Sequence, residues 1–449
     1  MDASSPAPFE VRCPLHGSIP FDARERAIID HRFVQRLRYI SQLGFASLVF
    51  PGATHTRFSH SLGVMHLAGQ VFDQVALKSA AYRDCGFSSA AHARFRGIVR
   101  LAGLLHDLGH PPFSHSFEPL LPDREQLPLP WDWYRSGEKT GRATHEDYSV
   151  AAIRALAEEK PDLMPMEDAR AICSLIDRRI APGATLVDGS GGGQGSGITV
   201  YPLLKQIVSG EIDADRMDYL RRDAHFAGVS YGLFDLPRLI QSLSCTVMDG
   251  GLVMTLAHDA LYTYENFLMA RFHMAMQVYF HKTLLPFEYF LKRAVQDGEI
   301  ELVLDGSLES FLSAREDHVM NLLHRAKGGR WAAKIVNRRP LSRLLRMSDL
   351  PDGESRARVM KAVAKLEGEG CEIIHLKEER RLSNLGWSNT GKDEAPIYVE
   401  QQILGRPEWL PLEAVSVLLE RYNQVFTIEA LYCDPAEAER GLAALREAL

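Results

Sequence analysis

Leu104-Leu105-His106-Asp107-Leu108-Gly109-His110 is the stretch of this chain that decides its fold. An imidazole and a carboxylate, His106 and Asp107, stand at the end of an apolar run that begins at Gly97. Burying both groups is costly unless they are paired or bind a metal. A divalent cation favours the ionised carboxylate and the neutral imidazole together. The dipeptide occurs easily by chance, so a metal site needs further ligands elsewhere in the chain.

Two more segments supply such ligands. His60 stands in Thr54–Val64, just before an apolar helical pattern, and Asp215 stands in Asp213–Tyr219. Each of these two residues alone is more simply interpreted as a core or capping residue. The four together offer two nitrogen and two oxygen ligands and leave positions open for water and substrate. The set predicts one divalent metal ion, and manganese, iron, zinc, cobalt or magnesium all suit it.

The bulk composition is typical of a globular enzyme in the cytoplasm. Hydrophobic residues make up 46% and charged residues 24% of the 449 residues. The net charge of −7 argues against general nucleic-acid binding. No uninterrupted apolar segment is long enough to span a membrane, and the first residues lack the pattern of a signal peptide. The six cysteines show no paired spacing, which predicts reduced thiols.

The periodicity of apolar residues predicts a mainly α fold. Helices are expected over 24–43, 62–82, 95–108, 145–159, 202–209 and 260–295. Strands are expected over 371–376, 396–400 and 425–433, with a helix over 412–423. The glycine-rich segment 181–197 is interpreted as a flexible linker, with a phosphate cradle as the less favoured alternative. We therefore predict a leader (1–13), a helical core (14–305) and a smaller α+β lobe (306–449).

The order of His60, His106-Asp107 and Asp215 resembles the HD phosphohydrolase superfamily. Longer strings, 35–44, 49–64, 106–115 and 215–219, are similar to the dNTP triphosphohydrolases, in particular to the branch that contains the vertebrate SAM-and-HD-domain enzyme. The similarity runs from about Pro14 to Lys282, and no SAM domain fits before Pro14. It implies an HD-domain helical core and a metal-activated water that attacks the α-phosphorus of a dNTP, giving deoxynucleoside and triphosphate.

Histidines after the HD pair are candidates for proton transfer, because the histidine pKa lies near neutrality. They are His110, His115 and His145. The resemblance implies that His145 is the general acid toward the leaving oxygen and that Glu118 orients it. The alternative for His145 is an ordinary first residue of a helix capped by Thr144.

The substrate contacts rest largely on the resemblance. Arg57, three residues before His60, offers a planar guanidinium suited to phosphate. Residues that match family positions contacting triphosphate or sugar are Arg216, Tyr219, Asp223 and Arg271. Gln42 and Leu43 match the pair that bonds the sugar 3′-hydroxyl and excludes a 2′-hydroxyl. Tyr279 matches the base-facing position, but Ala275 and Phe280 depart from the family pattern and leave the base preference open.

A second nucleotide site is suggested by three residues, Asp30, Gln35 and Arg38. They match family positions that hold an activating nucleotide between subunits, which implies a dimer or tetramer and additional magnesium with the nucleotide. The alternative is that they are ordinary polar positions of an amphipathic helix. The basic stretch 334–346 is likewise interpreted as an amphipathic helix with a solvated face, not as a nucleic-acid site.

Three functions remain open from the sequence. The first is a dNTP triphosphohydrolase. The second is an HD phosphohydrolase that acts on another nucleotide, a monophosphate or a signalling nucleotide, or on nucleic-acid ends. The third is a nucleotide sensor without catalysis.

Overall fold

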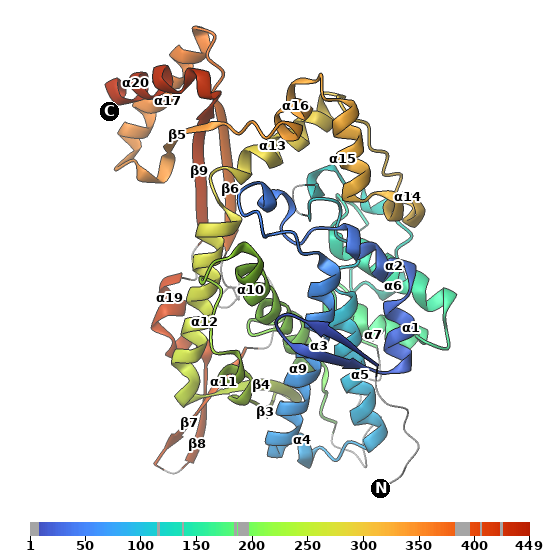
Figure 1. The fold of residues 1–449 in the computed structure, drawn as a ribbon. Coiled ribbons are helices and arrows are strands. Elements are labelled where there is room, and N and C mark those ends of the chain that lie inside the picture. Colours follow the sequence, from blue (N-terminus) through green and yellow to red (C-terminus); the bar gives the residue numbers. More distant parts are fainter. Residues whose placement is uncertain are drawn as a thin grey trace.

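The protein is described by a computed structural model that covers residues 9–114, 117–136, 139–183, 186, 197–381, 396–404, 406–422 and 425–449. His115 and most of the glycine-rich segment 181–197 lie outside the described residues. The fold is mainly helical, with a helical core and a smaller sheet-containing C-terminal region, as the sequence predicts (Figure 1).

Two long helices form the centre of the core. α3 (Arg57–Lys78) packs along α5 (Ser89–Leu105), and the side chain of Ser88 caps the start of α5 by accepting from the Ala91 N–H. Around this pair lie α6 (His145–Glu159), α7 (Met166–Ile176), α9 (Tyr201–Ser209) and α10 (Ala214–Ala227). Their buried faces form the largest apolar cluster of the described chain. This packing fixes the ends of α3, α5 and α10 relative to one another.

The N-terminal segment is more broken than predicted. It contains the antiparallel hairpin β1 (Phe9–Cys13) and β2 (Gly17–Phe21), then α1 (Ala23–Ile29), α2 (Arg32–Arg36) and η1 (Leu37–Tyr39). The single helix predicted over 24–43 is therefore wrong. His31 has extended backbone and accepts a hydrogen bond from the Phe33 N–H, so α2 begins anew after Asp30 closes α1.

The helix predicted over 260–295 is also divided. α12 (Leu261–Met274) continues into a π-helical turn (Ala275–Tyr279), and α13 begins again as Leu284–Gln296. Before α12 lie α11 (Leu236–Gln241) and an antiparallel hairpin of β3 (Leu243–Met248) and β4 (Gly251–Ala257) that the sequence reading missed.

The C-terminal third of the chain forms three groups of elements in different parts of the molecule. α14 (Leu308–Ser313), α15 (Glu316–Arg325) and α16 (Arg330–Val336) follow α13, and α15, α16 and α13 share one apolar cluster. β5 (Ser342–Arg346), β9 (Val425–Cys433) and β6 (Ile374–Arg381) form an antiparallel sheet in the order β5-β9-β6, with α17 (Gly353–Gly368) and α20 (Ala438–Ala448) against it. The segment 342–346, expected in a helix, is thus a strand.

The remaining strands of the C-terminal region join the sheet of the core. β7 (Tyr398–Ile403) pairs in parallel with β4, and β8 (Arg406–Pro411) completes a sheet of order β3-β4-β7-β8. α18 (Leu412–Val415) and α19 (Val417–Tyr422) follow, in place of one helix over 412–423. The domain boundary at residue 305 stays a prediction.

Short elements complete the described chain. They are η2 (Gly44–Leu48), α4 (Ala80–Asp84), η4 (Glu118–Leu120), η5 (Arg124–Gln126), η6 (Trp131–Trp133), η7 (His258–Ala260), η9 (Met347–Asp349) and η10 (Pro435–Glu437). A search of the described helices finds none with the length and apolarity that crossing a bilayer requires.

Candidate active site

A cavity of about 1840 Å³ opens between the ends of the core helices and the segments that cross them. Fifteen of the site residues proposed from the sequence line it. They are Gln42, Leu43, Arg57, His60, His106, Asp107, His110, Glu118, His145, Asp215, Arg216, Tyr219, Asp223, Arg271 and Tyr279. His115 lies outside the described residues. The cavity is therefore where predicted ligands, catalytic groups and substrate contacts meet.

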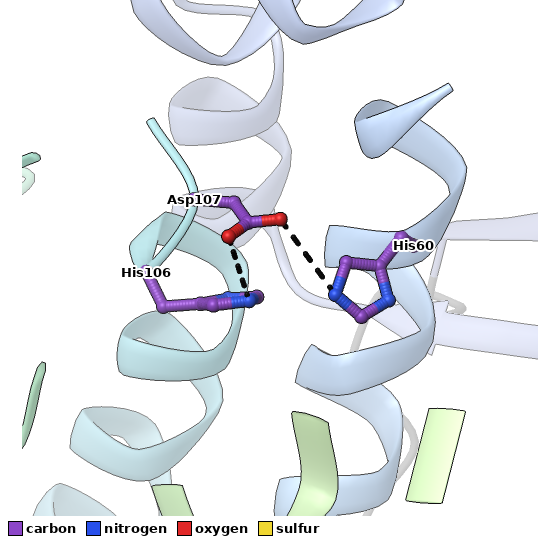
Figure 2. A group of neighbouring side chains, drawn as sticks. All are labelled: His60, His106 and Asp107. Carbon is purple, nitrogen blue, oxygen red and sulfur yellow. Dashed lines mark ion pairs between the residues drawn. The ribbon is translucent and has the colours of Figure 1, made fainter. Parts of the chain in front are cut away.

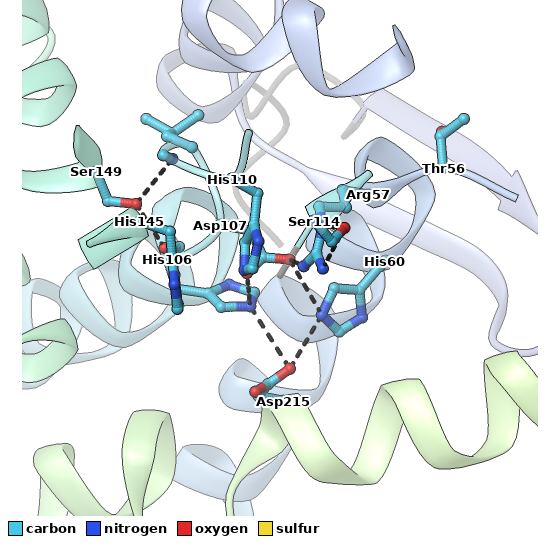
Figure 3. A network of polar contacts seen from close by, with 12 residues as sticks. Thr56, Arg57, His60, His106, Asp107, His110, Ser114, His145, Ser149 and Asp215 are labelled. Carbon is cyan, nitrogen blue, oxygen red and sulfur yellow. Dashed lines mark hydrogen bonds and ion pairs between the residues drawn. The ribbon is translucent and has the colours of Figure 1, made fainter. Parts of the chain in front are cut away.

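The four predicted metal ligands converge on one point. His60 lies in the first turn of α3, His106 and Asp107 directly follow α5, and Asp215 lies in the first turn of α10. One atom each of His60, His106 and Asp107 lies within 4.8 Å of the others (Figure 2). Asp215 Oδ1 lies 3.0 Å from His60 Nε2 and 3.5 Å from His106 Nε2 (Figure 3). Helix ends from three separate segments thus bring all four side chains together.

Both imidazoles are oriented with the same nitrogen toward the carboxylates. His60 Nδ1 bonds Asp218 Oδ2 at 2.8 Å, and His106 Nδ1 lies 2.8 Å from the Gly103 carbonyl oxygen. Each Nε2 therefore faces Asp107 and Asp215. Fixing one ring nitrogen by a hydrogen bond sets the tautomer and orientation of a metal-ligating histidine. The arrangement has the donor pattern of a ligand set.

His106 Nε2 tests whether a cation fits among these four side chains. This nitrogen is buried and has no hydrogen-bond partner within the described part of the chain, although Asp107 Oδ1 lies only 3.2 Å away. A buried polar atom without a partner is costly. A cation held by His60, His106, Asp107 and Asp215 would satisfy this nitrogen. Two imidazoles with two carboxylates are a donor set that divalent first-row metals accept.

Opposite charges within the cluster stabilise one another's ionised forms. Burial opposes ionisation of Asp107, but the Arg57 guanidinium and His106 outweigh it and hold the pKa of Asp107 well below its usual range. Burial likewise opposes protonation of His60, but hydrogen bonds with Asp215 and Asp218 raise its pKa to about 10. Because a ligating imidazole must be neutral, we expect metal binding to displace protons from this cluster.

Two glycines allow the close approach of the elements around the cluster. A Cβ at Gly63 of α3 would lie 2.0 Å from Asp218 Oδ1, so glycine there admits the carboxylate that holds His60. A Cβ at Gly109 would lie 1.9 Å from the His145 carbonyl oxygen. The Gly109 N–H also donates to Ser149 Oγ, whose hydroxyl donates to the His106 carbonyl oxygen (Figure 3). The first turns of α6 therefore sit directly against the His-Asp pair.

The predicted dyad is formed. His145 begins α6 after Thr144, which caps the helix, and its Nδ1 contacts Glu118 Oε1. Burial lowers the pKa of His145 and the hydrogen bond with Glu118 raises it. The net pKa lies above the ordinary histidine value. The His145 ring stacks on His110 with centroids 4.1 Å apart, and His110 Nε2 lies 3.2 Å from Asp107 Oδ1. The general-acid candidate therefore touches the metal cluster through His110.

Arg57 lies between the cluster and the neighbouring turn. Its Nη1 donates to Asp107 Oδ2 at 2.5 Å, and its Nε and Nη2 donate to Ser114 Oγ at 3.1 and 2.8 Å. Arg57 is 5% exposed, so its guanidinium is fixed by these partners. A fixed guanidinium at the edge of the cluster is suited to hold a phosphate.

The remaining predicted contacts form the opposite part of the wall. Asp223 accepts from the Tyr279 hydroxyl at 2.8 Å and bonds His55 Nε2 at 2.8 Å. Arg216 pairs with Asp213, and Arg271 pairs with Glu211. The other three residues, Gln42, Leu43 and Tyr219, also line the cavity. Both arginines are therefore held by carboxylates at the cavity wall.

The residues proposed for a second nucleotide lie elsewhere. Asp30 is exposed at the end of α1, and Arg38 packs over the Phe58 ring and donates to Gln35 Oε1 at 2.8 Å. Asp30, Gln35 and Arg38 do not line the cavity. Gln35 and Arg38 form one hydrogen-bonded pair on the outer face, and their regulatory role stays a prediction.

Sequence reasoning missed the residues that hold the predicted ones. Asp218 accepts from Arg222 at both oxygens, bonds His60, and also contacts His16 Nε2 at 2.6 Å. His55 holds Asp223 in the same way. A signal existed for Asp218, because it follows Asp215 by three residues and so lies on the same helix face. His55 lies within the string 49–64, but nothing in that string distinguishes it as a partner of Asp223.

Comparison with known proteins is consistent with this geometry. The HD domain family matches residues 57–223, which span the segment from Arg57 to Asp223. The deoxynucleoside triphosphate triphosphohydrolase SAMHD1 of Homo sapiens is 35% identical over 239 residues, 51% of this chain and 34% of that protein. An uncharacterized protein of Methanocaldococcus jannaschii is 28% identical over 324 residues, 70% of this chain and 57% of that protein.

A solved structure extends the likeness to the whole fold. A hypothetical protein from Aquifex aeolicus is 27% identical, with a TM-score of 0.69, and the match covers 98% of this chain and 100% of that one. By contrast, the chain spans about a third to a little over half the length of the curated relatives described above.

Proposed function

We propose that this chain, whose residues 57–223 match the HD domain family, hydrolyses deoxynucleoside triphosphates to deoxynucleosides and triphosphate. The observation that carries the proposal is the convergence of His60, His106, Asp107 and Asp215 beside a cavity with arginines on its wall. A bound divalent cation at this point supplies Lewis-acid polarisation of a phosphoryl oxygen and acidifies water.

The side chains of the cavity have separate tasks in this reaction. Water adds to the α-phosphorus, the bond from that phosphorus to the 5′-oxygen breaks, and a proton is delivered to the leaving oxygen. In this proposal His145 delivers that proton. Glu118 holds its ring at Nδ1, and Nε2 lies 3.4 Å from Oε1 of Glu146, which also lines the cavity. Arg57, Arg216 and Arg271 balance the negative charge of the phosphates.

Support for a sugar contact comes from Gln42. Its Oε1 is buried and has no hydrogen-bond partner among the residues that the structure describes. An acceptor in this state is suited to receive a hydroxyl, and a site built for a hydroxyl discriminates strongly against ligands that lack it. Leu43 follows on the same wall, and we propose that it excludes the 2′-hydroxyl of a ribonucleotide.

We further propose that the protein works as a homodimer or homotetramer in the cytoplasm, with a nucleotide activator near Asp30, Gln35 and Arg38 that carries its own magnesium. This part of the proposal rests only on the match of these three residues to family positions that hold an activating nucleotide. Activation by a nucleotide requires that it bind the assembled form more tightly than the separate subunits.

The deciding experiment incubates the purified protein with each dNTP and each rNTP. Manganese, magnesium, iron or cobalt is added in turn, and nucleotides are supplied singly and as mixtures. Release of tripolyphosphate from dNTPs is the expected result. Orthophosphate release or turnover of monophosphates only would indicate a different HD phosphohydrolase. Tight binding without turnover under all conditions would indicate a sensor.

A further inference from the structure

A carboxylate from far along the chain ties two parts of the cavity wall together. Glu316, the first residue of α15, accepts at Oε1 from the Ser41 N–H at 2.8 Å and from the Phe113 N–H at 3.0 Å. Its Oε2 accepts from the Ser41 hydroxyl. Ser41 directly precedes Gln42, and Phe113 lies in the turn that follows the His-Asp pair. One side chain thus bridges the sugar-facing loop and the catalytic turn.

The bridged turn has a backbone that needs external support. Phe113 and Ser114 both have φ of 57°, in the left-handed region that residues other than glycine rarely adopt. Such conformations persist only where the surroundings hold them in place. Phe45 stacks on Phe113 with ring centroids 4.3 Å apart, and a Cβ at Gly44 would lie 3.2 Å from the Phe113 carbonyl oxygen. The turn therefore fits against residues 44–45 without room to shift.

The same contacts continue to the phosphate-facing arginine. The Ser114 hydroxyl donates to the Ser41 carbonyl oxygen at 3.2 Å and accepts from Arg57. Arg57 in turn bonds Asp107 (Figure 3). The Arg57 N–H also donates to the Ile40 carbonyl oxygen at 2.9 Å. A displacement of Ser41 or of the turn therefore moves Arg57 relative to the cluster.

We propose that Glu316 is a positioning residue that fixes Gln42 and Leu43 relative to Arg57 and thereby sets the preference for deoxyribose over ribose. This inference rests on the proposed function. A wall that excludes a hydroxyl by contact loses its selectivity when it moves, and a shift of about 1 Å in a bound substrate lowers rates by about 10²-fold.

Three variants separate this role from a general loss of stability. Glu316→Ala removes all three acceptor contacts. Glu316→Gln keeps an oxygen for the two N–H groups, and its amide donates to the Ser41 hydroxyl, so it is the conservative rescue. Asp317→Asn is the matched control, because Asp317 is the next residue of α15, is exposed, and pairs with Arg315 instead.

The readouts are kcat/KM for one dNTP and its rNTP, bound metal, and amide hydrogen exchange. For Glu316→Ala we expect an about 10²-fold loss of kcat/KM on the dNTP and an about tenfold smaller dNTP-to-rNTP ratio, with metal content unchanged. The rate of amide hydrogen exchange in Glu316→Ala should rise at 41–46 and 113–114 and stay unchanged in α6 and α10. Glu316→Gln should remain within about threefold of wild type, and Asp317→Asn should match it.

Other results overturn the proposal. An unchanged dNTP-to-rNTP ratio with unchanged exchange at 41–46 would do so, as would an equal loss for both nucleotides. If Glu316→Ala does not fold, Ser41→Ala removes only the hydroxyl contact and should reduce the ratio in the same direction. If the wild-type protein hydrolyses no dNTP, the proposed function fails by itself, while the exchange measurement still decides whether Glu316 holds the two segments.

Discussion

The cavity has two walls of different construction. One wall is made by helix ends, with His60, His106 and Asp215 at the termini of α3, α5 and α10 inside the largest apolar cluster. The other wall consists of the segment from His110 to His145, which contains turns, short 3₁₀ helices and, among its described residues, two non-glycine residues with left-handed backbone. The first wall is held by packing and the second by individual polar contacts such as Glu118 to His145.

This difference in how the two walls are held indicates which function each wall can serve. Ligands on packed helix ends keep their geometry without substrate, which suits a preformed metal site. Groups held by a few hydrogen bonds can adjust as a substrate enters and a proton moves. A change on the helix wall should therefore abolish metal binding, whereas a change on the loop wall should spare the metal and affect turnover.

The largest effect is expected for Asp107→Ala. The change removes a ligand and leaves the buried Arg57 guanidinium without its carboxylate partner. We expect loss of bound metal, a fall in turnover of about 10⁴-fold, and a loss of about 3–5 kcal/mol in the free energy of unfolding. Metal analysis, triphosphate release and denaturant unfolding measure these three quantities.

A matched control is Asp73→Ala on α3, away from the cavity. Asp73 pairs with Arg96 on the exposed face of α3, so its removal should cost less than about 1 kcal/mol and leave metal content and turnover unchanged. If Asp107→Ala kept normal metal content and turnover, the ligand set would be wrong.

On the loop wall, His145→Ala should separate metal from chemistry. The metal content should stay that of the wild type, because the four proposed ligands are retained, while kcat falls by about 10²–10⁴-fold. Metal analysis alongside kcat tests this directly. His324→Ala, which removes an exposed histidine of α15, is the control and should change neither quantity. Unchanged turnover in His145→Ala would assign the proton transfer to another group.

The helix wall could be predicted from the sequence because its residue types are costly to bury. Nothing but a metal or strong pairing explains His106 and Asp107 at the end of an apolar helix, whereas His60 and Asp215 joined the set because the four residues together offer a ligand set and their order resembles the family. Of the side chains that support them, Asp218 and His55 lie in the strings 215–219 and 49–64, but a residue that holds another residue looks like any polar residue. Glu316 carries no pattern that connects it to a site formed by residues far away in the chain.

Elements with a clear apolar periodicity could be predicted from the sequence, whereas pairings between strands far apart in the chain could not. α6 occupies residues His145–Glu159, the range the apolar spacing predicts. The β3–β4 hairpin was missed although Asp249-Gly250, with φ of 49° and 78°, is a typical two-residue hairpin turn that the sequence displays. The parallel pairing of β7 with β4 depends on contacts between distant segments, so no local signal separates it from a C-terminal lobe.

A pH-rate profile sharpens the contrast within the loop wall. The hydrogen bond to Glu118 raises the pKa of His145 against the opposing effect of burial, so the acid form persists above the ordinary value of 6.5. The alkaline limb of kcat should therefore lie above pH 6.5 and move down in Glu118→Gln. A fall of one pH unit in that limb lowers kcat at pH 8 by about tenfold. Glu158→Gln, an exposed position on α6, should leave the profile unchanged. If the alkaline limb of the kcat profile did not move in Glu118→Gln, the assignment of Glu118 and His145 as a dyad would be contradicted.

The smallest effect concerns the stability of the helix wall. His66 is half-buried on α3, and burial together with the nearby His16 and Arg100 lowers its pKa to about 4. The unfolded chain binds a proton at His66 below pH 6.5, whereas the folded chain does so only near pH 4. Stability is therefore fully present above pH 6.5 and declines as pH falls toward 4, by about 2 kcal/mol after allowance for partial exposure. Urea unfolding of wild type and His66→Asn at pH 8, 6 and 4 measures this contribution. The variant should lose less stability over that range. An identical decline in both proteins would show that His66 remains solvated and that this part of α3 is less tightly packed than the helix wall requires.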